Sequence, residues 1–351
     1  MPGPELSVCI CTHNRPEDVR LCLDGLRAQT LPADRWEILV IDSASAPGRA
    51  AALARLVAGY GAARLIRLDV AGLSLARNAG AAAARAPWIA YLDDDAVPTP
   101  DWAAQALAAL AGPGPPPALL GGRVLPTWEA PLPAWWPARL RGVLSIVEAA
   151  GAGAYRSADL PPGLEPCGAN LFVHVATLRA AGGFCPAIGR RGAILLSDEE
   201  VHLASRLQAA GHGIRYDSRL VVHHRIAAAR LTPGWLLSRL HWQGVSAVLT
   251  RRLLGQGGAV WREMPRRLAV AAVCAPVALL PRSSTRLLAW RWRLAYALGF
   301  IRGALGGGGR ASGADRRAAS DPAPDAAGGW PRWRVPAWRG LPSRPIGGTR
   351  G

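Results

Sequence analysis

Four short apolar runs alternate with helical patterns over the first 112 residues, and this alternation constrains the fold more than any other feature. Strands that alternate with helices form βαβ units, which build a mainly parallel sheet. The runs contain few polar residues, as is typical of strands covered by helices on both faces. We therefore predict an α/β fold with a helix-flanked, mainly parallel sheet. The apolar runs are residues 6–12, 36–42, 63–69 and 88–95, and the helical patterns are residues 15–30, 51–61, 72–86 and 101–112.

The middle of the chain has a different composition. Residues 112–166 are rich in Pro, Gly and Trp, so we predict long loops with little regular structure there. Residues 168–184 then read as a strand followed by a helix. A helix at 199–210 precedes a further strand, which we expect to end at His223 and His224.

Positive charge is concentrated in the C-terminal third. The net charge is +17, and residues 225–302 contain 13 arginines and a single acidic residue, Glu263. The chain has no Lys, and its bias toward Arg, Ala, Gly and Pro makes an arginine at any one position weak evidence for a site. The apolar run 268–280 is shorter than the roughly 20 residues that a membrane span needs. Residues 306–351 are predicted to be a disordered tail.

Residues 286–305 form a basic amphipathic pattern, which favours a helix on a membrane surface. The predicted apolar face consists of Leu287, Trp290, Leu294, Leu298, Ile301 and Leu305. We expect the protein to be cytoplasmic and peripheral on the inner face of an anionic membrane. The six cysteines form no CxxC pair and the N-terminus begins directly with a strand, which also favours reduced thiols in the cytoplasm.

Polar residues follow three of the predicted strands. Thr12, His13 and Asn14 end the first strand, Asp42 and Ser43 end the second, and Asp93, Asp94 and Asp95 end the fourth. Because ligands of parallel α/β sheets bind beyond the carboxyl ends of the strands, these side chains should meet at one edge. An acidic triplet at this place is suited to a cation that carries phosphate.

Four fragments, in this order, resemble family 2 glycosyltransferases, which are inverting enzymes with a GT-A fold. They are "VCICTHNRPEDVRLCLDGLRAQT", "EILVIDSAS", "GLSLARNAGAAAARAPWIAYLDDDAVPTPDW" and "SDEEVHLASRLQAAG". The resemblance covers residues 5–250 and is specific because four fragments keep their order and spacing. It implies a catalytic domain at 1–225, with a nucleotide-sugar half at 1–111 and an acceptor half at 112–225, before a basic helical region at 226–305.

The resemblance also implies a nucleotide-diphosphate sugar as donor. Asp93, Asp94 and Asp95 resemble the family's DXD motif, in which Asp93 faces the ribose, Asp95 faces a metal, and Asp94 can share either role. Carboxylates suit Mg²⁺ or Mn²⁺, and such a cation stabilises the charge on a departing diphosphate. The matching positions for base, ribose and phosphate contacts are Thr12, Asn14, Asp42 and Arg77.

An inverting transfer needs a base that takes the proton of the acceptor hydroxyl. "DEEVHLASRL" resembles the family's Glu-Asp motif, with Leu203 and Arg206 three and six residues after Glu200. Glu200 therefore stands at the catalytic position, although Glu is one methylene longer than the usual Asp. Glu199 and Asp198 remain alternatives as the base.

Two further groups are assigned only by resemblance. In some GT-A enzymes a His at the end of the domain completes the metal shell, which points to His224, with His223 as the alternative. Gly168, Ala169 and Asn170 match the acceptor side. Trp128, Trp135 and Trp136 are suited either to stacking on sugars or to packing the loops onto the core, and we favour packing.

The expected partners are a nucleotide-diphosphate sugar, a glycan or lipid-linked acceptor, and an anionic membrane surface. A role in cell-envelope or exopolysaccharide synthesis would follow. One rival function is a nucleotidyltransferase, but the first strand is not followed by a Gly-rich loop that could grip a triphosphate. The other rival is an Arg-rich nucleic-acid-binding protein. The basic region carries no binding motif for nucleic acid, so we expect no such partner.

Overall fold

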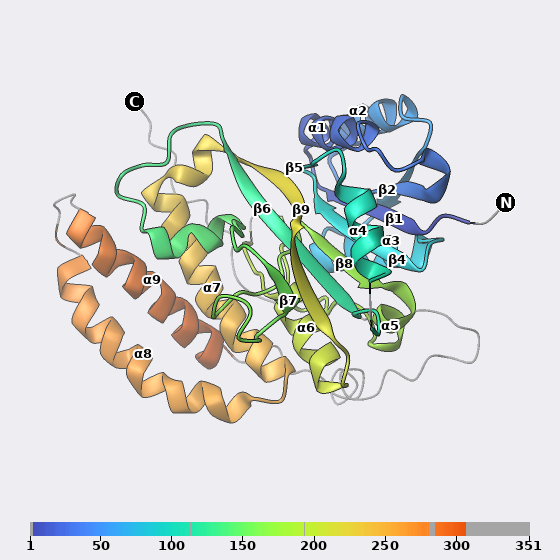
Figure 1. Ribbon diagram of the computed structural model, residues 1–351. Coiled ribbons are helices and arrows are strands. Elements are labelled where there is room, and N and C mark those ends of the chain that lie inside the picture. The colour runs from blue at the N-terminus through green and yellow to red at the C-terminus, as the bar shows by residue number, and fades with distance from the viewer. Residues whose placement is uncertain (1–2, 113, 193, 279, 281–284, 307–351) are drawn as a thin grey trace.

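A computed structural model of the chain describes residues 3–112, 114–192, 194–278, 280 and 285–306 (Figure 1). The predicted disordered tail lies outside these residues, apart from Gly306. The strands are β1 (Leu6–Thr12), β2 (Trp36–Ser43), β3 (Ala63–Leu68), β4 (Trp88–Asp93), β5 (Ala96–Pro98), β6 (Leu119–Trp128), β7 (Ala152–Ala154), β8 (Leu171–His174) and β9 (Ile214–Ile226).

Helices account for most of the remaining described structure. The α-helices are α1 (Pro16–Arg27), α2 (Pro47–Ala58), α3 (Leu73–Ala83), α4 (Trp102–Leu110), α5 (Val175–Ala180), α6 (Glu199–Ala209), α7 (Pro233–Leu253), α8 (Gly257–Ala278) and α9 (Thr285–Leu305). Short 3-10 helices cover Ala33–Arg35, Ala138–Leu144 and Ala228–Leu231. The four N-terminal strands and helices that we predict from the alternating pattern are all present, with boundaries shifted by a few residues.

One sheet runs through the structure in the order β3-β2-β1-β4-β8-β6-β9-β5, with β7 paired to β9. Strands β1 to β4 are mutually parallel, as the βαβ pattern predicts. Beyond β4 the sheet is mixed, because β8 runs antiparallel to both β4 and β6 while β6 runs parallel to β9. The prediction of a mainly parallel sheet therefore holds only for the N-terminal half.

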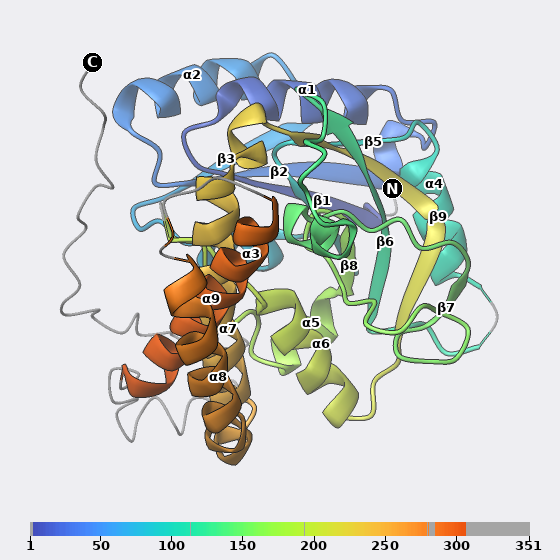
Figure 2. The ribbon, with the colours of Figure 1, turned by 90° about the vertical axis from the view of Figure 1, so that its left-hand side faces the viewer.

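Both faces of the parallel half are buried, which explains the uninterrupted apolar strands. Val8 and Ile10 of β1 belong to a core cluster that also contains the buried faces of α1, α2 and α4. Cys9, the residue between them, belongs to the cluster on the other face, with residues of α3, α5 and α6. Figure 2 shows α1 and α2 above the sheet and α3, α5 and α6 below it. Successive residues of a strand point to opposite faces, so each face has its own core.

The expectation of long loops with little regular structure at residues 112–166 is wrong at two strands. The segment contains the ten-residue strand β6 and the short strand β7. The sequence of β6 disguises it, because Gly121 and Gly122 interrupt the apolar pattern that predicts a strand. A Cβ at Gly121 would meet the hydroxyl of Tyr155, and one at Gly122 would meet the amide of Asn170, so both glycines are required by close packing.

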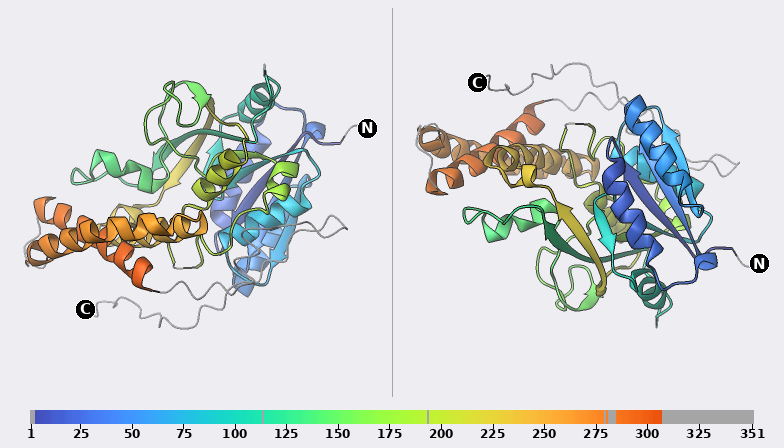
Figure 3. Two further views of the ribbon diagram at one scale, coloured as in Figure 1. Left: turned by 90° about the horizontal axis from the view of Figure 1, so that it is seen from below. Right: turned by 90° about the horizontal axis from the view of Figure 1, so that it is seen from above.

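Helices α7, α8 and α9 pack side by side at one end of the sheet (Figures 1 and 3). Gly244 of α7 and Gly299 of α9 allow a close approach, because a Cβ on Gly299 would meet the backbone of His241. The face predicted to lie on a membrane for residues 286–305 is partly exposed, with Leu287 buried. Leu298 and Leu305 are exposed, whereas the side of α9 that packs inward carries Ala297, Phe300 and Ala304.

Within the described part of the chain, none of the helices has the length and apolar character needed to cross a bilayer. All six cysteines fall within that part and are free thiols.

Candidate functional site

A cavity of about 700 Å³ opens at the carboxyl ends of β1, β2 and β4. The strand ends contribute Thr12, Ser43 and Asp93 with its two neighbours, and the far side is formed by loop residues 161–168, residues 196–201 and α7. This edge of the sheet is the ligand-binding edge of parallel α/β folds. The structure therefore brings together the acidic triplet and the Asp198–Glu200 segment, which are about a hundred residues apart in sequence.

Asp95 is the most heavily bonded member of the acidic triplet. Its Oδ2 atom accepts hydrogen bonds from Arg15 (2.6 Å) and Arg230 (2.9 Å), and its Oδ1 atom lies 3.1 Å from Nε2 of His224. Burial alone would raise the pKa of this carboxyl. The imidazole and the two guanidinium groups outweigh burial and hold the pKa of Asp95 well below its usual value.

Asp94 has a different electrostatic environment. Its two oxygens accept hydrogen bonds from the hydroxyl of Thr12 (2.7 Å) and the guanidinium of Arg15 (2.6 Å). Burial is the dominant influence and raises the pKa of Asp94 to about 7, against the opposing charge of Arg15. Two adjacent carboxyl groups thus have pKa values pushed apart, which is a common feature of functional sites.

Asp93, Asp95 and His224 converge so that one potential ligand atom from each lies within 4.8 Å of the others. His224 is on β9 opposite Ala96 of β5, and its side chain is buried, whereas that of His223 is exposed. The alternation of side chains along β9 therefore selects His224 over His223 for this cluster. Two carboxylates and one imidazole form a donor set that suits Mn²⁺ or Mg²⁺, so the residues present fit a divalent cation.

The predicted nucleotide-binding residues form a braced rim at the ends of β1 and β2. Thr12 lines the cavity, while Asn14 has a left-handed backbone (φ 62°) and its side-chain oxygen accepts a hydrogen bond from the Ala46 amide (2.7 Å). Asp42 is buried, accepts a hydrogen bond from the Ser45 amide (2.9 Å) and pairs with Arg67 (3.0 Å). In this structure Asn14 and Asp42 thus hold the turn after β2 in shape.

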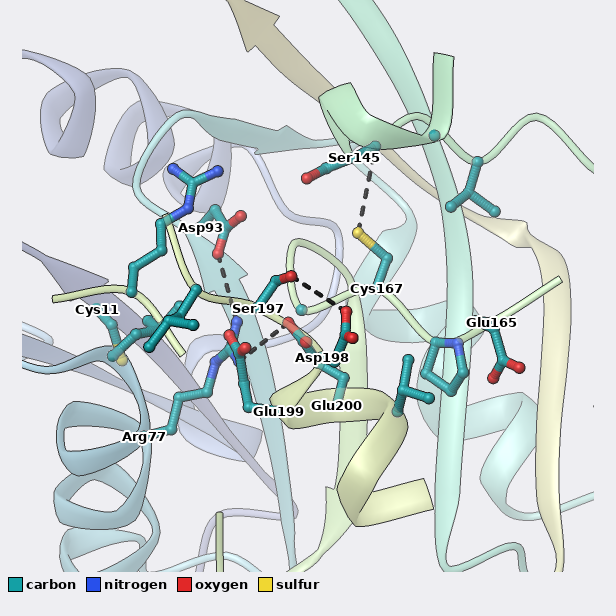
Figure 4. Close-up of a pocket in the computed structure, with 18 of the residues that line it drawn as sticks. Cys11, Arg77, Asp93, Ser145, Glu165, Cys167, Ser197, Asp198, Glu199 and Glu200 are labelled. Carbon is teal, nitrogen blue, oxygen red and sulfur yellow. Dashed lines mark hydrogen bonds and ion pairs between the residues drawn. The ribbon is translucent and has the colours of Figure 1, made fainter. Parts of the chain in front are cut away.

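Arg77 connects the two acidic groups of the cavity, as Figure 4 shows. Its guanidinium is only 2% exposed and lies 3.0 Å from both Glu199 Oε1 and Glu200 Oε1, and 3.7 Å from Asp93 Oδ1. Burial would lower the pKa of Arg77, but the carboxylates of Glu200 and Glu199 outweigh it and raise that pKa. The predicted nucleotide contact is thus a side chain already engaged with three carboxylates.

The three candidate bases differ in exposure and in bonding. The side chain of Glu199 is 4% exposed, and that of Glu200 is 14% exposed. Burial, with the neighbouring Glu200 charge, raises the pKa of Glu199 to about 8. Burial also raises the pKa of Asp198, whose Oδ1 atom accepts hydrogen bonds from Gln243 (2.7 Å) and Ser197 (3.1 Å). Glu200 is therefore more open to the cavity than Glu199, and Asp198 is partly exposed as well.

The predicted acceptor residues are separated by the structure. Gly168 lines the cavity, where an added Cβ would meet the guanidinium of Arg77 and the carboxylate of Glu200. Ala169 and Asn170 are fully buried in the core instead. The Asn170 side chain accepts a hydrogen bond from the Trp102 indole (2.9 Å) and donates to the carbonyl of Leu220 (2.8 Å), so it braces the sheet and does not face an acceptor.

The tryptophans pack, as we favour from the sequence. Trp136 is buried in a cluster with Ile226, Leu236 and Leu240, and Trp128 and Trp135 pack against the same cluster. This cluster fixes α7 against the end of β9.

Several arginines of the cavity are not singled out by the sequence. Arg15 and Arg230 contact the acidic triplet, and Arg190 and Arg239 also line the cavity. The position of Arg15, immediately after the polar end of β1, is a local signal. The others fall in loops or in the Arg-rich region, where compositional bias hides them.

Comparison with known proteins agrees with this architecture. Residues 7–123 match the family model described as Glycosyl transferase family 2. The chain is 27% identical over 176 residues to a glucosyl-dolichyl phosphate glucuronosyltransferase of Haloferax volcanii, covering 50% of this chain and 54% of that protein. It is 30% identical over 122 residues to glycosyltransferase AglE of the same organism, covering 34% and 40%. The chain thus spans about half or less of the length of these curated relatives.

Solved structures show the same fold. The mannosyltransferase PcManGT from Pyrobaculum calidifontis, in complex with GDP-Man and Mn²⁺, aligns with a TM-score of 0.55 at 18% identity, over 88% of this chain and 89% of that one. S. aureus TarS 1–349 in complex with UDP-GlcNAc aligns with a TM-score of 0.50 at 13% identity, over 85% and 91%. The fold of this chain is GT-A, as the sequence predicts.

Proposed function

We propose that this chain, whose residues 7–123 match the family model of glycosyl transferase family 2, transfers a sugar from a nucleotide-diphosphate donor to an acceptor hydroxyl, with inversion at the anomeric carbon. One observation carries the proposal. A single cavity contains the acidic triplet at the end of β4 and the carboxylates at the start of α6, and Arg77 bridges the two groups. Diphosphate release and proton removal each need one of these groups.

Asp93, Asp95 and His224 would hold a divalent cation, Mg²⁺ or Mn²⁺. When bound, such a cation stabilises negative charge on the departing nucleoside diphosphate. The protein groups around it already limit repulsion, because Arg15 and Arg230 neutralise Asp95. The family resemblance and the geometry of the donor atoms support this proposal. Two carboxylates and one imidazole suit both Mg²⁺ and Mn²⁺.

Glu200 is the proposed base. Its side chain is more exposed than that of Glu199, and Arg77 fixes one of its oxygens at 3.0 Å. Asp198 is engaged by hydrogen bonds from Ser197 and Gln243. In the proposed reaction the acceptor oxygen forms a bond to the anomeric carbon from the side opposite the diphosphate. Glu200 takes the hydroxyl proton, and the diphosphate leaves with the electron pair of the broken bond. Glu199, whose pKa of about 8 keeps it protonated at neutral pH, is less suited to that role.

The remaining residues have proposed positioning and binding roles. Thr12 and Asp94 face the cavity at the end of β1 and β4, and we propose that they contact the nucleotide. Asn14 and Asp42 would shape the pocket for base and ribose through the turn after β2. Arg77 would act mainly by orienting Asp93 and Glu200.

An anionic membrane surface is the proposed site of action, with a glycan or lipid-linked acceptor. The outward side of α8 carries Trp261, Leu268 and Val273, which are 55%, 51% and 61% exposed. Arg262 and Arg266 are exposed beside them. A helix with an apolar outward face flanked by arginines is suited to the lipid interface. Co-sedimentation with anionic vesicles tests this part of the proposal, and a protein that stays in the supernatant would refute it.

The name of one curated relative supports a lipid-linked acceptor. The curated relative that aligns over 176 residues is named as an enzyme of glucosyl-dolichyl phosphate, which is a lipid-linked sugar. We propose by analogy a role in building a cell-envelope or exopolysaccharide glycan, on the cytoplasmic face. The six free thiols are consistent with a reducing compartment.

The experiment that tests the proposed function uses the full chain and a panel of UDP, GDP, dTDP and ADP, each with and without Mn²⁺. We expect one nucleotide to raise the melting temperature, and the increase to depend on the cation. The sugar donors of that nucleotide are then incubated with the protein, and turnover is followed by ¹H NMR. A transferred sugar with the opposite anomeric configuration to the donor supports the proposal. If no nucleotide binds and no donor turns over, the proposal is wrong.

A further inference from the structure

Arg239 is a buried cation that the proposed reaction does not use. It lies on α7, lines the cavity and is 9% exposed. Among the described residues, no hydrogen bond or ion pair is formed by its guanidinium, and its Nη1 atom is buried without a partner. A buried charge without a partner is costly to a fold, by several kcal/mol in general. Such a side chain is therefore a strong indicator of a missing ligand.

A second arginine lies beside it. Arg190 also lines the cavity. Burial is the main reason why the pKa of Arg239 falls to about 10, and the nearby charge of Arg190 lowers that pKa further. Arg239 therefore stays cationic at neutral pH. Neither Arg190 nor Arg239 has a carboxylate within ion-pair distance in the described part of the structure. Two cations that repel each other and face one cavity favour an anion between them.

The surrounding structure holds both arginines in place. The loop before Arg190 is tightly packed, because Gly189 has a left-handed backbone (φ 95°) and abuts the side chains of Ser74 and Glu199. The carbonyl of Arg190 accepts a hydrogen bond from the amide of Leu73 (3.0 Å). On α7, Gln243 lies one turn after Arg239 and donates to Asp198 (2.7 Å). Both arginines are thus fixed relative to the carboxylates at the start of α6.

Arg239 lies on the side of the cavity next to the candidate bases, and Arg190 lies close to both Arg239 and Arg230. The charges that act on Arg239 are those of Arg190 and of Asp198, Glu199 and Glu200. Arg230 contacts Asp95 of the acidic triplet. The diphosphate is expected at the triplet, so an anion at Arg190 and Arg239 would belong to another part of the substrates.

We propose that Arg190 and Arg239 form an anion subsite beside the base, which binds a phosphate or a carboxylate carried by the acceptor or by the transferred sugar. This inference rests on the proposed function and adds the chemical class of the substrate. The subsite selects substrates by charge, because an anion there satisfies the guanidinium of Arg239. A neutral substrate leaves it unpaired.

The test measures dissociation constants for pairs of probes that differ by one anionic group, with full-chain protein and Mn²⁺. The acceptor arm compares citronellyl phosphate with citronellol in the presence of a bound nucleoside diphosphate. The donor arm compares UDP-glucuronate with UDP-glucose and GDP-mannuronate with GDP-mannose. In one arm we expect the anionic member to bind at least about tenfold more tightly, since hydrogen bonds to charged groups contribute about 1.5–3 kcal/mol. The arm that shows the preference identifies the source of the anion.

Variants then assign the preference to the two arginines. Arg239→Gln and Arg190→Gln should each remove most of the preference and leave binding of the neutral probe unchanged. Arg239→Lys should restore part of it. Arg55→Gln is the matched control, because Arg55 is exposed on α2 and does not line the cavity. Melting temperatures of all variants establish that they fold, and a Gln variant that does not fold is replaced by the Met variant at the same position.

Three outcomes would overturn the inference. Wild-type protein without an anion preference in either arm excludes the subsite, while nucleotide binding in the same samples leaves the proposed function intact. Equal weakening of charged and neutral donors by Arg239→Gln would show that this arginine holds the diphosphate instead. If no nucleotide binds to the wild-type protein, both the subsite and the proposed function are wrong.

Discussion

Single charged residues hold the cavity in shape by sharing partners. Arg77 fixes Asp93, Glu199 and Glu200 at once, and Arg15 bridges Asp94 and Asp95. A guanidinium suits this task because its planar donors can serve several carboxylates without losing charge. Gly168 completes the arrangement, since any side chain there would displace Arg77 or Glu200.

Replacing Glu200 with Gln should reduce turnover without preventing donor binding. The change removes the proposed base, and general bases contribute about 10²–10⁴-fold to rate. We expect kcat to fall in that range, measured by release of the nucleoside diphosphate in the presence of acceptor. Glu165→Gln is the control, because Glu165 lines the rim of the same cavity and pairs with the exposed Arg156. A larger loss in Glu199→Gln or Asp198→Asn than in Glu200→Gln would move the base to that residue.

Glu199 should make the protein less stable as the pH rises. Its pKa is about 8 in the folded protein, above the ordinary value of 4.5, so the folded state binds a proton that the unfolded state has lost. Stability from this group is complete below pH 4.5 and is lost as the pH rises through 8. We expect the melting temperature to fall between pH 6.5 and 8, and to fall less in Glu199→Gln. The buried His202 has a pKa of about 4 in the folded protein, lowered from 6.5 mainly by burial, so its effect on stability falls below pH 6.5 and does not overlap with that of Glu199. Equal slopes in the two proteins would be evidence against a raised pKa at Glu199.

The sequence alone predicts the site residues that follow strands or keep a motif spacing. It does not predict the roles of residues that are set by tertiary packing. Asp93 to Asp95 follow an apolar strand, and Glu200 keeps the spacing to Leu203 and Arg206, so local pattern identifies both groups. Asn170 follows Gly168 closely in sequence, yet its hydrogen bonds to Trp102 and Leu220 turn it into the core. No local pattern encodes partners that are about 50 or more residues away.

At the scale of elements, the apolar pattern predicts β1, β2 and β4 because these strands are buried on both faces, and it also predicts the half-buried strand β3. It failed for β6, where Gly121 and Gly122 break the apolar run for reasons of packing against Tyr155 and Asn170. For α9, the apolar pattern alone does not identify the side that packs against the protein. That helix has apolar residues on more than one side, and the side that packs is chosen by the small residues that face α7.

The contact between α7 and α9 should tolerate no added side chain at Gly299. A Cβ there would meet the backbone of His241, which cannot move without displacing α7. We expect Gly299→Ala to destabilise the protein by about 1–3 kcal/mol, as overpacking does in cores. Urea unfolding followed by circular dichroism gives the value. Gly258→Ala is the control, because the space around Gly258 at the start of α8 is open. If both variants unfold at the same urea concentration, the close approach of α7 and α9 is incorrect.

At the scale of the whole molecule, a nearly neutral N-terminal part, residues 1–224, is joined to a strongly basic helical end. Residues 225–302 carry 13 arginines against one acidic residue, but not all of this charge is free. Arg251 and Arg267 both pair with Glu263, and Arg252 donates to carbonyls at the end of α9. Among the described residues of this segment, Arg262, Arg266 and Arg293 are exposed, so they are available to a membrane.

Membrane binding should depend on both the apolar and the charged side chains of α8. We expect the full chain to sediment with vesicles that contain anionic lipid, and to bind neutral vesicles weakly. Trp261→Ser with Leu268→Ser should reduce binding to anionic vesicles by about tenfold or more, given about 25 cal/mol per Å² of apolar surface lost. Leu21→Ser, a change of an exposed leucine on α1, serves as the control. Unchanged sedimentation of the double variant would exclude α8 as the lipid-facing helix.

The most direct measurement is calorimetric titration of Mn²⁺ into the full chain with its nucleoside diphosphate, for the wild-type protein and for Asp95→Asn. Asp101→Asn, an exposed carboxylate at the start of α4, is measured alongside as the control. We predict that the wild type and Asp101→Asn bind Mn²⁺ and nucleotide together, and that Asp95→Asn, although folded, loses at least about tenfold in Mn²⁺ affinity and in metal-dependent nucleotide affinity. Undiminished Mn²⁺ and nucleotide binding by folded Asp95→Asn would contradict the assignment of the acidic strand end as the cation site on which the proposed function depends.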